Sequence, residues 1–263
     1  AGFAVGDSCL IVANAKDVLE SGTKLAFKQA REAKKPTIFF INKLDEENTS
    51  FNDAYTLLHE EFGKSIIPFE VPIVENGEVV GSVNIIKNKA WYYKGEHAGS
   101  DTPQPVPEDM KDEISMYKDQ IAEAVAMGDD DLMEKFFSGE EFSENEVAHG
   151  LRIGVRNGDI RPVFAGSALN CLGIERILDL ISEYFPNYAE KGTVIAYDAN
   201  NEEVMMETNE NEAFSAQVFK TIVDPFVGKI SYIKVMSGVL TSDSQIYNSN
   251  KEQLEKVNQI YII

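Results

Sequence analysis

The chain has 263 residues, of which 43% are hydrophobic and 26% charged. This composition is typical of a globular protein of about two domains and excludes collagen-like, fibrous and mostly disordered chains. Its 24 Lys and Arg and 44 Asp and Glu give a net charge of −20, which repels a bare phosphate backbone. No apolar run approaches the roughly 18 residues of a membrane span. We therefore expect no membrane contact and no direct nucleic-acid site in this chain, with a local site inside a larger assembly as the alternative.

The two ends of the sequence and its two cysteines lead to expectations about the parent protein and its cellular compartment. It starts at Ala1 without a basic leader and stops on the apolar residues 261–263, an end that a natural domain seldom leaves unprotected. We expect a piece of a longer protein, with a mature protein that has short termini as the alternative. Cys9 and Cys171 form no C-x-x-C motif and lie among apolar or small residues, which suits a reducing cytoplasm.

The first 65 residues alternate between strand and helix patterns. Residues 8–13 and 36–41 are apolar runs typical of buried parallel strands. Residues 23–35 have helical spacing, and so does the stretch from Phe51 to Phe62. This order predicts right-handed βαβ units in a doubly wound sheet.

The pattern then changes to a hairpin and an acidic helical region. Two β-like runs, 66–73 and 79–86, flank a turn signal at residues 75–77, and a connector follows at 99–107. From Glu108 to Glu146 the chain has 14 acidic and 3 basic residues. Two apolar stripes are predicted to be buried there: Ile114, Tyr117, Ile121 and Val125, and then Leu132, Met133, Phe136 and Phe137. The charge run is interpreted as a solvated helix face, with a docking surface for a basic partner as the alternative.

A helix start and a return to the α/β pattern follow. Ser143 and Glu146 form an S-x-x-E capping box, which predicts a helix from 144 to about 156 that ends at Asn157-Gly158. Residues 160–166 predict a buried strand, and a helical stripe runs from Ile174 to Phe185. After Pro186 only β patterns occur, and they predict a small antiparallel barrel or sandwich. Its strands are expected at 193–198, 202–206, 213–223, 228–236, 244–248 and 256–263, with turns at 200–201, 224–225 and 237–238.

The most informative motif is Asn42-Lys43-Leu44-Asp45, at the carboxyl end of the strand 36–41. Ligands bind at this end of strands in open α/β sheets. The carboxylate of Asp45 can accept from both N1–H and the 2-amino group of guanine, whereas adenine would leave it unpaired. Asn42 can hold the loop and touch the base edge, and the stem of Lys43 can lie along the base face. A polar turn capped by Asp45 is the alternative.

A second turn, Ser167-Ala168-Leu169, follows the strand that starts near Ile160. The small Ala168 would let a backbone N–H approach a base carbonyl, and Ser167 could orient Asp45 or its own loop. The alternative is a tight strand-to-helix turn with Ser167 or Asn170 as the N-cap. Two such turns at strand ends of one sheet are more specific than either alone.

With these two loops the sequence resembles the translational GTPases, and its surroundings resemble elongation factor G. The likeness runs along nearly the whole chain. It is carried by four segments: residues 36–45, residues 129–141 in the insert, residues 180–186, and residues 219–240 in the barrel. It implies a partial P-loop-GTPase-like sheet at 1–71 and 159–187, an inserted α+β subdomain at 72–158, and an incomplete antiparallel β-barrel at 188–263. Ribosome-protecting tetracycline-resistance proteins and release factors share this architecture and remain alternatives, as does a non-catalytic acidic docking module.

The resemblance implies that the intact protein binds the ribosome and hydrolyses GTP with Mg²⁺ during translocation in the cytoplasm. It assigns guanine recognition to Asn42, Lys43, Asp45, Ser167, Ala168 and Leu169. No G-x-x-x-x-G-K-[ST] and no matching D-x-x-G occur in these 263 residues. We therefore expect no catalytic residue, no metal site, no GTP hydrolysis and no tightly bound nucleotide in this chain.

Two further clusters are given structural roles. His59-Glu60-Glu61 is interpreted as an exposed helix face, and the three histidines have no metal-binding spacing. Trp91-Tyr92-Tyr93 is interpreted as part of a packed strand, because few basic residues lie near it.

Overall fold

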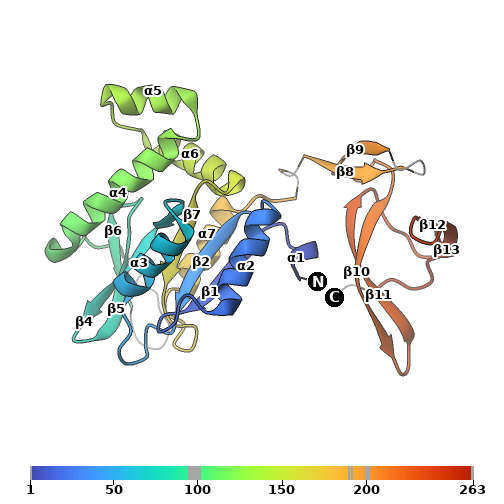
Figure 1. Ribbon diagram of the computed structural model, residues 1–263, viewed down its shortest axis with the longest axis horizontal. Helices are drawn as coiled ribbons and strands as arrows, with labels where there is room; N and C mark the ends of the chain where they lie inside the picture. The colour runs from blue at the N-terminus through green and yellow to red at the C-terminus, as the bar shows by residue number, and fades with distance from the viewer. Residues whose placement is uncertain (1, 94–101, 189, 191, 199–201, 262–263) are drawn as a thin grey trace. The chain divides into compact units, whose positions relative to one another are not determined.

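The computed structural model describes residues 2–93, 102–188, 190, 192–198 and 202–261. The chain forms two units, residues 7–185 and residues 1–6 with 186–263 (Figure 1). The first unit is α/β and the second consists mainly of antiparallel strands. The expected fold class is therefore confirmed.

The core of the first unit is a parallel sheet in the order β1-β2-β7-β3. Its strands are β1 (Cys9–Asn14), β2 (Thr37–Asn42), β3 (Ile66–Pro68) and β7 (Arg161–Ala165). Strand β7 lies between β2 and β3 and pairs with both, although it follows β3 by more than 90 residues of sequence. The carboxyl ends of β2 and β7 are adjacent because Ile41 pairs with Ala165.

Helices cover both faces of this sheet at β2, which is buried along nearly its whole length. One face of β1 is open, because Leu10 and Val12 are 41% and 54% exposed, so the expectation of a buried strand at 8–13 is wrong in part. On one face Phe39 packs against Phe27 of α2 (Ser21–Glu32) and Phe62 of α3 (Phe51–Phe62). On the other face Phe164 contacts Phe69, which packs against Tyr184 of α7 (Ile174–Tyr184). The predicted βαβ pattern is confirmed.

A second, three-stranded antiparallel sheet follows β3 directly. It consists of β4 (Glu70–Glu75), β5 (Glu78–Asn84) and β6 (Lys89–Tyr92). Asn76 and Gly77 form the predicted hairpin turn with φ of 52° and 85°. The run 66–73, expected as one strand, is divided at Phe69 between the two sheets. Trp91 is buried in β6, as expected, and residues 99–101 of the predicted connector lie outside the described residues.

A buried carboxylate lies in this second sheet. Glu70 is 4% exposed and accepts hydrogen bonds from the Ser82 hydroxyl at 3.2 Å and the Asn84 amide at 3.3 Å. Burial raises the pKa of the Glu70 carboxyl above its ordinary value, and these hydrogen bonds and the nearby charge of Arg176 only partly oppose the shift. Arg176, from α7, stacks over the Trp91 ring at 4.6 Å, so α7 contacts the second sheet as well as the first.

The acidic region is helical. It contains the 3₁₀ turn η1 (Glu108–Met110) and the helices α4 (Lys111–Ala126), α5 (Asp130–Ser138) and α6 (Glu144–Asn157). The first predicted stripe is buried on α4. The second prediction is wrong in part: Leu132 is buried, but Phe136 and Phe137 are 37% and 79% exposed. Phe137 lies about 140° around the helix from Leu132 and is therefore outside the buried face, whereas Phe136, one turn after Leu132, stacks on Phe142 with ring centroids 6.4 Å apart and is only partly covered.

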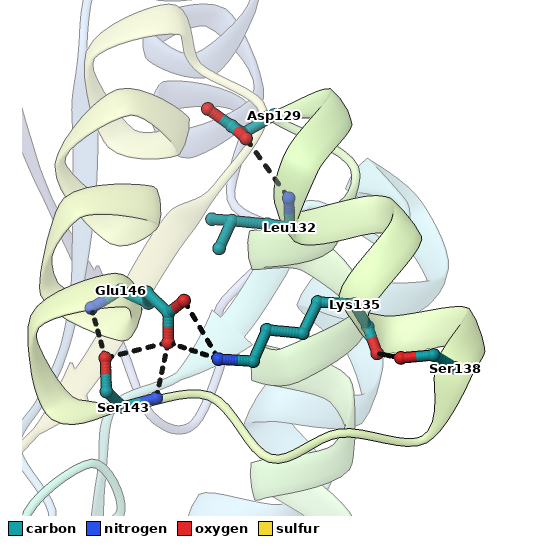
Figure 2. Close-up of polar contacts among 6 residues, drawn as sticks. All are labelled: Asp129, Leu132, Lys135, Ser138, Ser143 and Glu146. Carbon is teal, nitrogen blue, oxygen red and sulfur yellow. Dashed lines mark hydrogen bonds and ion pairs between the residues drawn. The ribbon is translucent and has the colours of Figure 1, made fainter.

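Polar contacts cap the start of α5 and, separately, fix the turn between α5 and α6 (Figure 2). Asp129 caps α5 by accepting from the backbone N–H of Leu132 at 3.1 Å. The predicted capping box is confirmed: the Glu146 carboxylate accepts from the Ser143 backbone N–H at 2.7 Å, and the helix ends at Gly158 with φ of 79°. Lys135 reaches the same carboxylate at 2.8 and 2.9 Å. These hydrogen bonds lower the pKa of Glu146 to about 2, with Lys135 as the largest cause.

His59 differs from its predicted environment. Glu60 and Glu61 are exposed, but His59 is half-buried. Its Nδ1 lies 3.1 Å from the carbonyl oxygen of Ile66, a contact that requires the proton on Nδ1. The neighbouring Tyr55 hydroxyl donates to Gln120 of α4 at 3.4 Å, so this corner of α3 is covered by the acidic region.

The second unit contains α1 (Gly2–Val5) and three antiparallel strand pairs. The pairs are β8 (Thr193–Tyr197) with β9 (Glu203–Glu207), β10 (Ser215–Asp224) with β11 (Gly228–Ser237), and β12 (Gln245–Asn248) with β13 (Gln253–Lys256). The strand expected at 256–263 is wrong. The turn after Asn248 returns the chain at once, so β13 ends at Lys256 and residues 257–261 are not in a strand. The predicted turn at 200–201 and residues 262–263 lie outside the described residues.

Candidate functional site

The loop after β2 is fixed by its backbone. Leu44 is 5% exposed, and its N–H donates to the Gly166 carbonyl at 3.1 Å. The Thr49 hydroxyl contacts the carbonyl oxygens of Leu44 and Glu46 at 3.2 and 2.8 Å. Lys43 has a φ of 70°, in the left-handed region. The side chains of Lys43 and Asp45 are therefore on the outside of a loop whose middle residue is anchored in the core.

The loop after β7 is a closed turn. The Gly166 N–H donates to the Ile41 carbonyl at 3.0 Å. Ser167 and Leu172 exchange backbone hydrogen bonds at 3.0 and 2.9 Å, and Ser167 is fully buried. The Ser167 Oγ accepts from the Asn170 N–H at 3.2 Å, so Ser167 orients its own loop. The N-cap of α7 is Gly173, so neither Ser167 nor Asn170 has the capping role considered as the alternative.

One hydrogen bond joins the two loops. The Ala168 backbone N–H donates to Oδ1 of Asn42 at 2.8 Å. The structure thus brings together Asn42 and Ala168 from segments that are 126 residues apart in sequence. The Ala168 N–H is therefore engaged by Asn42 in this structure. Leu169 is 85% exposed, and Asp45 is exposed at the same end of the sheet.

Sequence reasoning missed Glu46 and Lys16. One carboxylate oxygen of Glu46 lies 3.2 Å from the Lys43 ammonium, and the other lies 3.0 Å from the ammonium of Lys16, just after β1. The hydrogen bonds from Lys16 and then Lys43 hold the pKa of Glu46 below its usual range. The spacing of Lys43 and Glu46 is a local signal for their pairing. Nothing in the sequence indicated that Lys16 would join them, since this depends on the pairing of β1 with β2.

Two polar side chains lie near each other in sequence at this end of the sheet. Asp45 supplies an accessible acceptor pair, and Asn42 supplies an amide fixed by Ala168. Among the described residues no group of three or more His, Cys, Asp and Glu side chains is arranged to hold a metal ion. Nor does the described part of the chain contain a helix that is long and apolar enough to cross a membrane.

Comparison with known proteins gives the family. Residues 1–187 match the elongation factor Tu GTP binding domain, and residues 213–262 match elongation factor G domain 2. The chain is 32% identical over 261 residues to an elongation factor G-like protein of Thermotoga maritima. The matched region covers 99% of this chain and 37% of the relative.

A solved structure supports the same fold. The chain superposes on the crystal structure of a protein from Thermus thermophilus with a TM-score of 0.77 at 23% identity, covering 97% of this chain and 35% of that one. The chain thus spans little more than a third of the length of the proteins that it matches. By the match over residues 1–187, it belongs to the elongation factor Tu GTP-binding domain family, and it is similar to the elongation-factor-G-like translational GTPases.

Proposed function

We propose that the loops at residues 42–45 and 167–169 recognise the guanine base of GTP or GDP. The observation that carries this proposal is the 2.8 Å hydrogen bond from the Ala168 N–H to Asn42, because it joins the two loops at one end of the sheet. Ligands of open α/β sheets bind at this end of the strands. A family whose model is a GTP-binding domain supports the same ligand.

Each group has a defined role in the proposal. The exposed carboxylate of Asp45 accepts from N1–H and the 2-amino group of guanine. Asn42 holds the two loops in register, and its amide contacts the base edge. The stem of Lys43 covers the base face. The second loop presents its backbone to the base carbonyl at Leu169, while Ala168 holds the loop against Asn42 through its N–H. An adenine base would leave Asp45 without a donor, so discrimination between the bases comes mainly from this carboxylate.

The match to the family also supports a proposal for the activity of the whole protein. We infer that the protein acts as a GTPase of the elongation factor G type, with Mg²⁺, on the ribosome in the cytoplasm, where it promotes translocation. The division into a sheet domain (1–71 and 159–187), an insert (72–158) and a barrel segment (188–263) is part of this proposal. The phosphate-binding motif does not occur in the 263 residues, so this chain by itself is expected to contribute base recognition and no hydrolysis.

The test is an NMR titration of the isotope-labelled 263-residue chain with millimolar GDP and, separately, ADP. We expect GDP to shift the amide signals of Ala168 and Leu169 more strongly than ADP does. In Asp45→Asn the preference should move from GDP towards xanthosine diphosphate, because the Asn amide can donate to the xanthine 2-carbonyl. Asp119→Asn, an exposed change on α4, is the matched control and should behave as the wild type. Equal responses to GDP and ADP, or an unchanged preference in Asp45→Asn, would contradict the proposal.

A further inference from the structure

Glu46 stands out among the charged groups next to the proposed base site. Its two carboxylate oxygens bind ammonium groups from two different loops, Lys16 after β1 and Lys43 after β2. The backbone around it is fixed: the Glu46 N–H donates to the Lys43 carbonyl at 3.1 Å, and the Glu46 carbonyl accepts from Thr49 at 2.8 Å. The Glu46 side chain therefore extends from a backbone segment that hydrogen bonds keep in place.

Stability does not explain this arrangement. The side chains of Lys16, Lys43 and Glu46 are 45%, 49% and 36% exposed. Ion pairs between groups this exposed contribute little to folding stability, because water screens them and ordering the side chains costs entropy. A role in the geometry of the neighbouring loop is the better explanation.

The geometry affects the two residues on which base recognition depends. Lys43 has a long, flexible stem, and tying its ammonium to Glu46 restricts the directions that the stem can take. Asp45 lies only two positions beyond Lys43, and it is the nearest carboxylate in sequence that Lys43 could pair with if Glu46 were absent. Such a pair would occupy the acceptor that guanine needs.

We propose that Glu46 is a positioning residue of the guanine site, which orders the stem of Lys43 and keeps the Asp45 carboxylate free for the base. This inference rests on the proposed function of the two loops. It assigns Glu46 an action through Lys43 and Asp45, with no contact to the nucleotide. Lys16 has the supporting role of holding the second carboxylate oxygen and so linking the loop after β1 to the site.

The experiment compares Glu46→Gln with Glu47→Gln in the full 263-residue chain. Both changes remove one negative charge from adjacent positions, and Glu47 is exposed. We expect Glu46→Gln to weaken GDP binding by about threefold to tenfold in an NMR titration, while Glu47→Gln stays within about twofold of the wild type. Glu46→Asp, which retains the charge, should recover part of the loss.

Two readouts separate positioning from a general structural effect. The side-chain signals of Lys43 in the nucleotide-free chain should report greater mobility in Glu46→Gln, while the amide signals of Ala168 and Leu169 remain at their wild-type positions. The preference for GDP over ADP should also fall in Glu46→Gln, because Lys43 would then pair with the Asp45 carboxylate for part of the time. If the wild type prefers GDP and Glu46→Gln binds it equally well, the inference is overturned and the proposed function stands. If the wild type does not prefer GDP, the proposed function itself is overturned, and the inference with it.

Discussion

Replacing Gly166 with Ala should disrupt the junction between the two loops. A Cβ at this position would lie 2.0 Å from the carbonyl oxygen of Leu172 and 2.9 Å from its carbon. These are backbone atoms, so no side-chain rotation relieves the contact. The Leu172 carbonyl would have to move by more than about 1 Å to reach an ordinary van der Waals distance. That movement breaks its 3.0 Å hydrogen bond with the Ser167 N–H, next to the residue that contacts Asn42.

The cost follows from two terms. Losing one or two backbone hydrogen bonds costs about 0.5–1.5 kcal/mol each, and forcing an extra carbon into a packed site costs about 1–3 kcal/mol. We expect Gly166→Ala to lower the free energy of unfolding by about 2–5 kcal/mol. The loss should be accompanied by a shift of the Ala168 amide signal, because the turn that holds Ala168 has moved.

Denaturant unfolding followed by tryptophan fluorescence measures this change. The only tryptophan, Trp91, is buried in the unit of residues 7–185 and so reports the unfolding of that unit. Gly22→Ala is the matched control: a Cβ there meets nothing within 4 Å, and the residue is in α2. The control should be neutral or more stable by up to about 1 kcal/mol. A Gly166→Ala stability within about 0.5 kcal/mol of the wild type would refute the steric reasoning.

Three further predictions concern charged groups and affinity. Because burial raises the pKa of Glu70, ionisation of its carboxyl should lower the free energy of unfolding as the pH rises above about 4.5. Denaturation curves at pH 4 to 8 should show that Glu70→Gln reduces this pH dependence. An unchanged slope in Glu70→Gln would contradict this prediction. The pKa of Glu146 is lowered to about 2, so the stabilisation from its Lys135 pair should be complete above about pH 4.5 and be lost as the pH falls through about 2. The difference in melting temperature between the wild type and Lys135→Met should therefore shrink steadily from pH 4.5 down to pH 2, and a constant difference would disprove the link. Calorimetry of the 263-residue chain with GDP and Mg²⁺ should give a Kd of about 1 mM or weaker, because the strongest nucleotide contacts are charge-assisted bonds to phosphate. Micromolar binding would show that the phosphates find another site in this chain.

Local signals in the sequence predicted most of the elements. The apolar run 36–41 predicted β2, and the polar motif directly after it predicted a loop with exposed Lys43 and Asp45. Ser143, Glu146 and Gly158 predicted the start and the end of α6, because capping interactions join residues within a few positions of each other. Asn76-Gly77 predicted the hairpin for the same reason, since its positive φ angles are a property of those two residues.

Where local patterns were ambiguous, the tertiary structure decided the outcome. The continuous apolar run 66–73 has no signal at Phe69, yet β3 joins the parallel sheet and β4 joins the antiparallel one. His59 has an ionisable side chain on a helix, and such side chains are usually exposed. Here α4 of the acidic region contacts the neighbouring Tyr55, and His59 is half-buried. Phe136 and Phe137 have helical apolar spacing, but Phe136 stacks on Phe142 of the turn after α5 and Phe137 is 79% exposed, so neither ring enters the core.

For the candidate site, the sequence by itself determined which residues follow each strand, and the sheet order decided which of them meet. Strands buried on both faces have no alternation of polar and apolar residues, so their pattern carries little information about neighbours or register. The contact between Asn42 and Ala168 exists because β7 lies beside β2. The pairing of Glu46 with Lys16 likewise exists because β1 lies on the other side of β2. Hydrogen-bond and ion-pair partners so far apart in sequence are set by the packing of the whole sheet, which no local motif encodes.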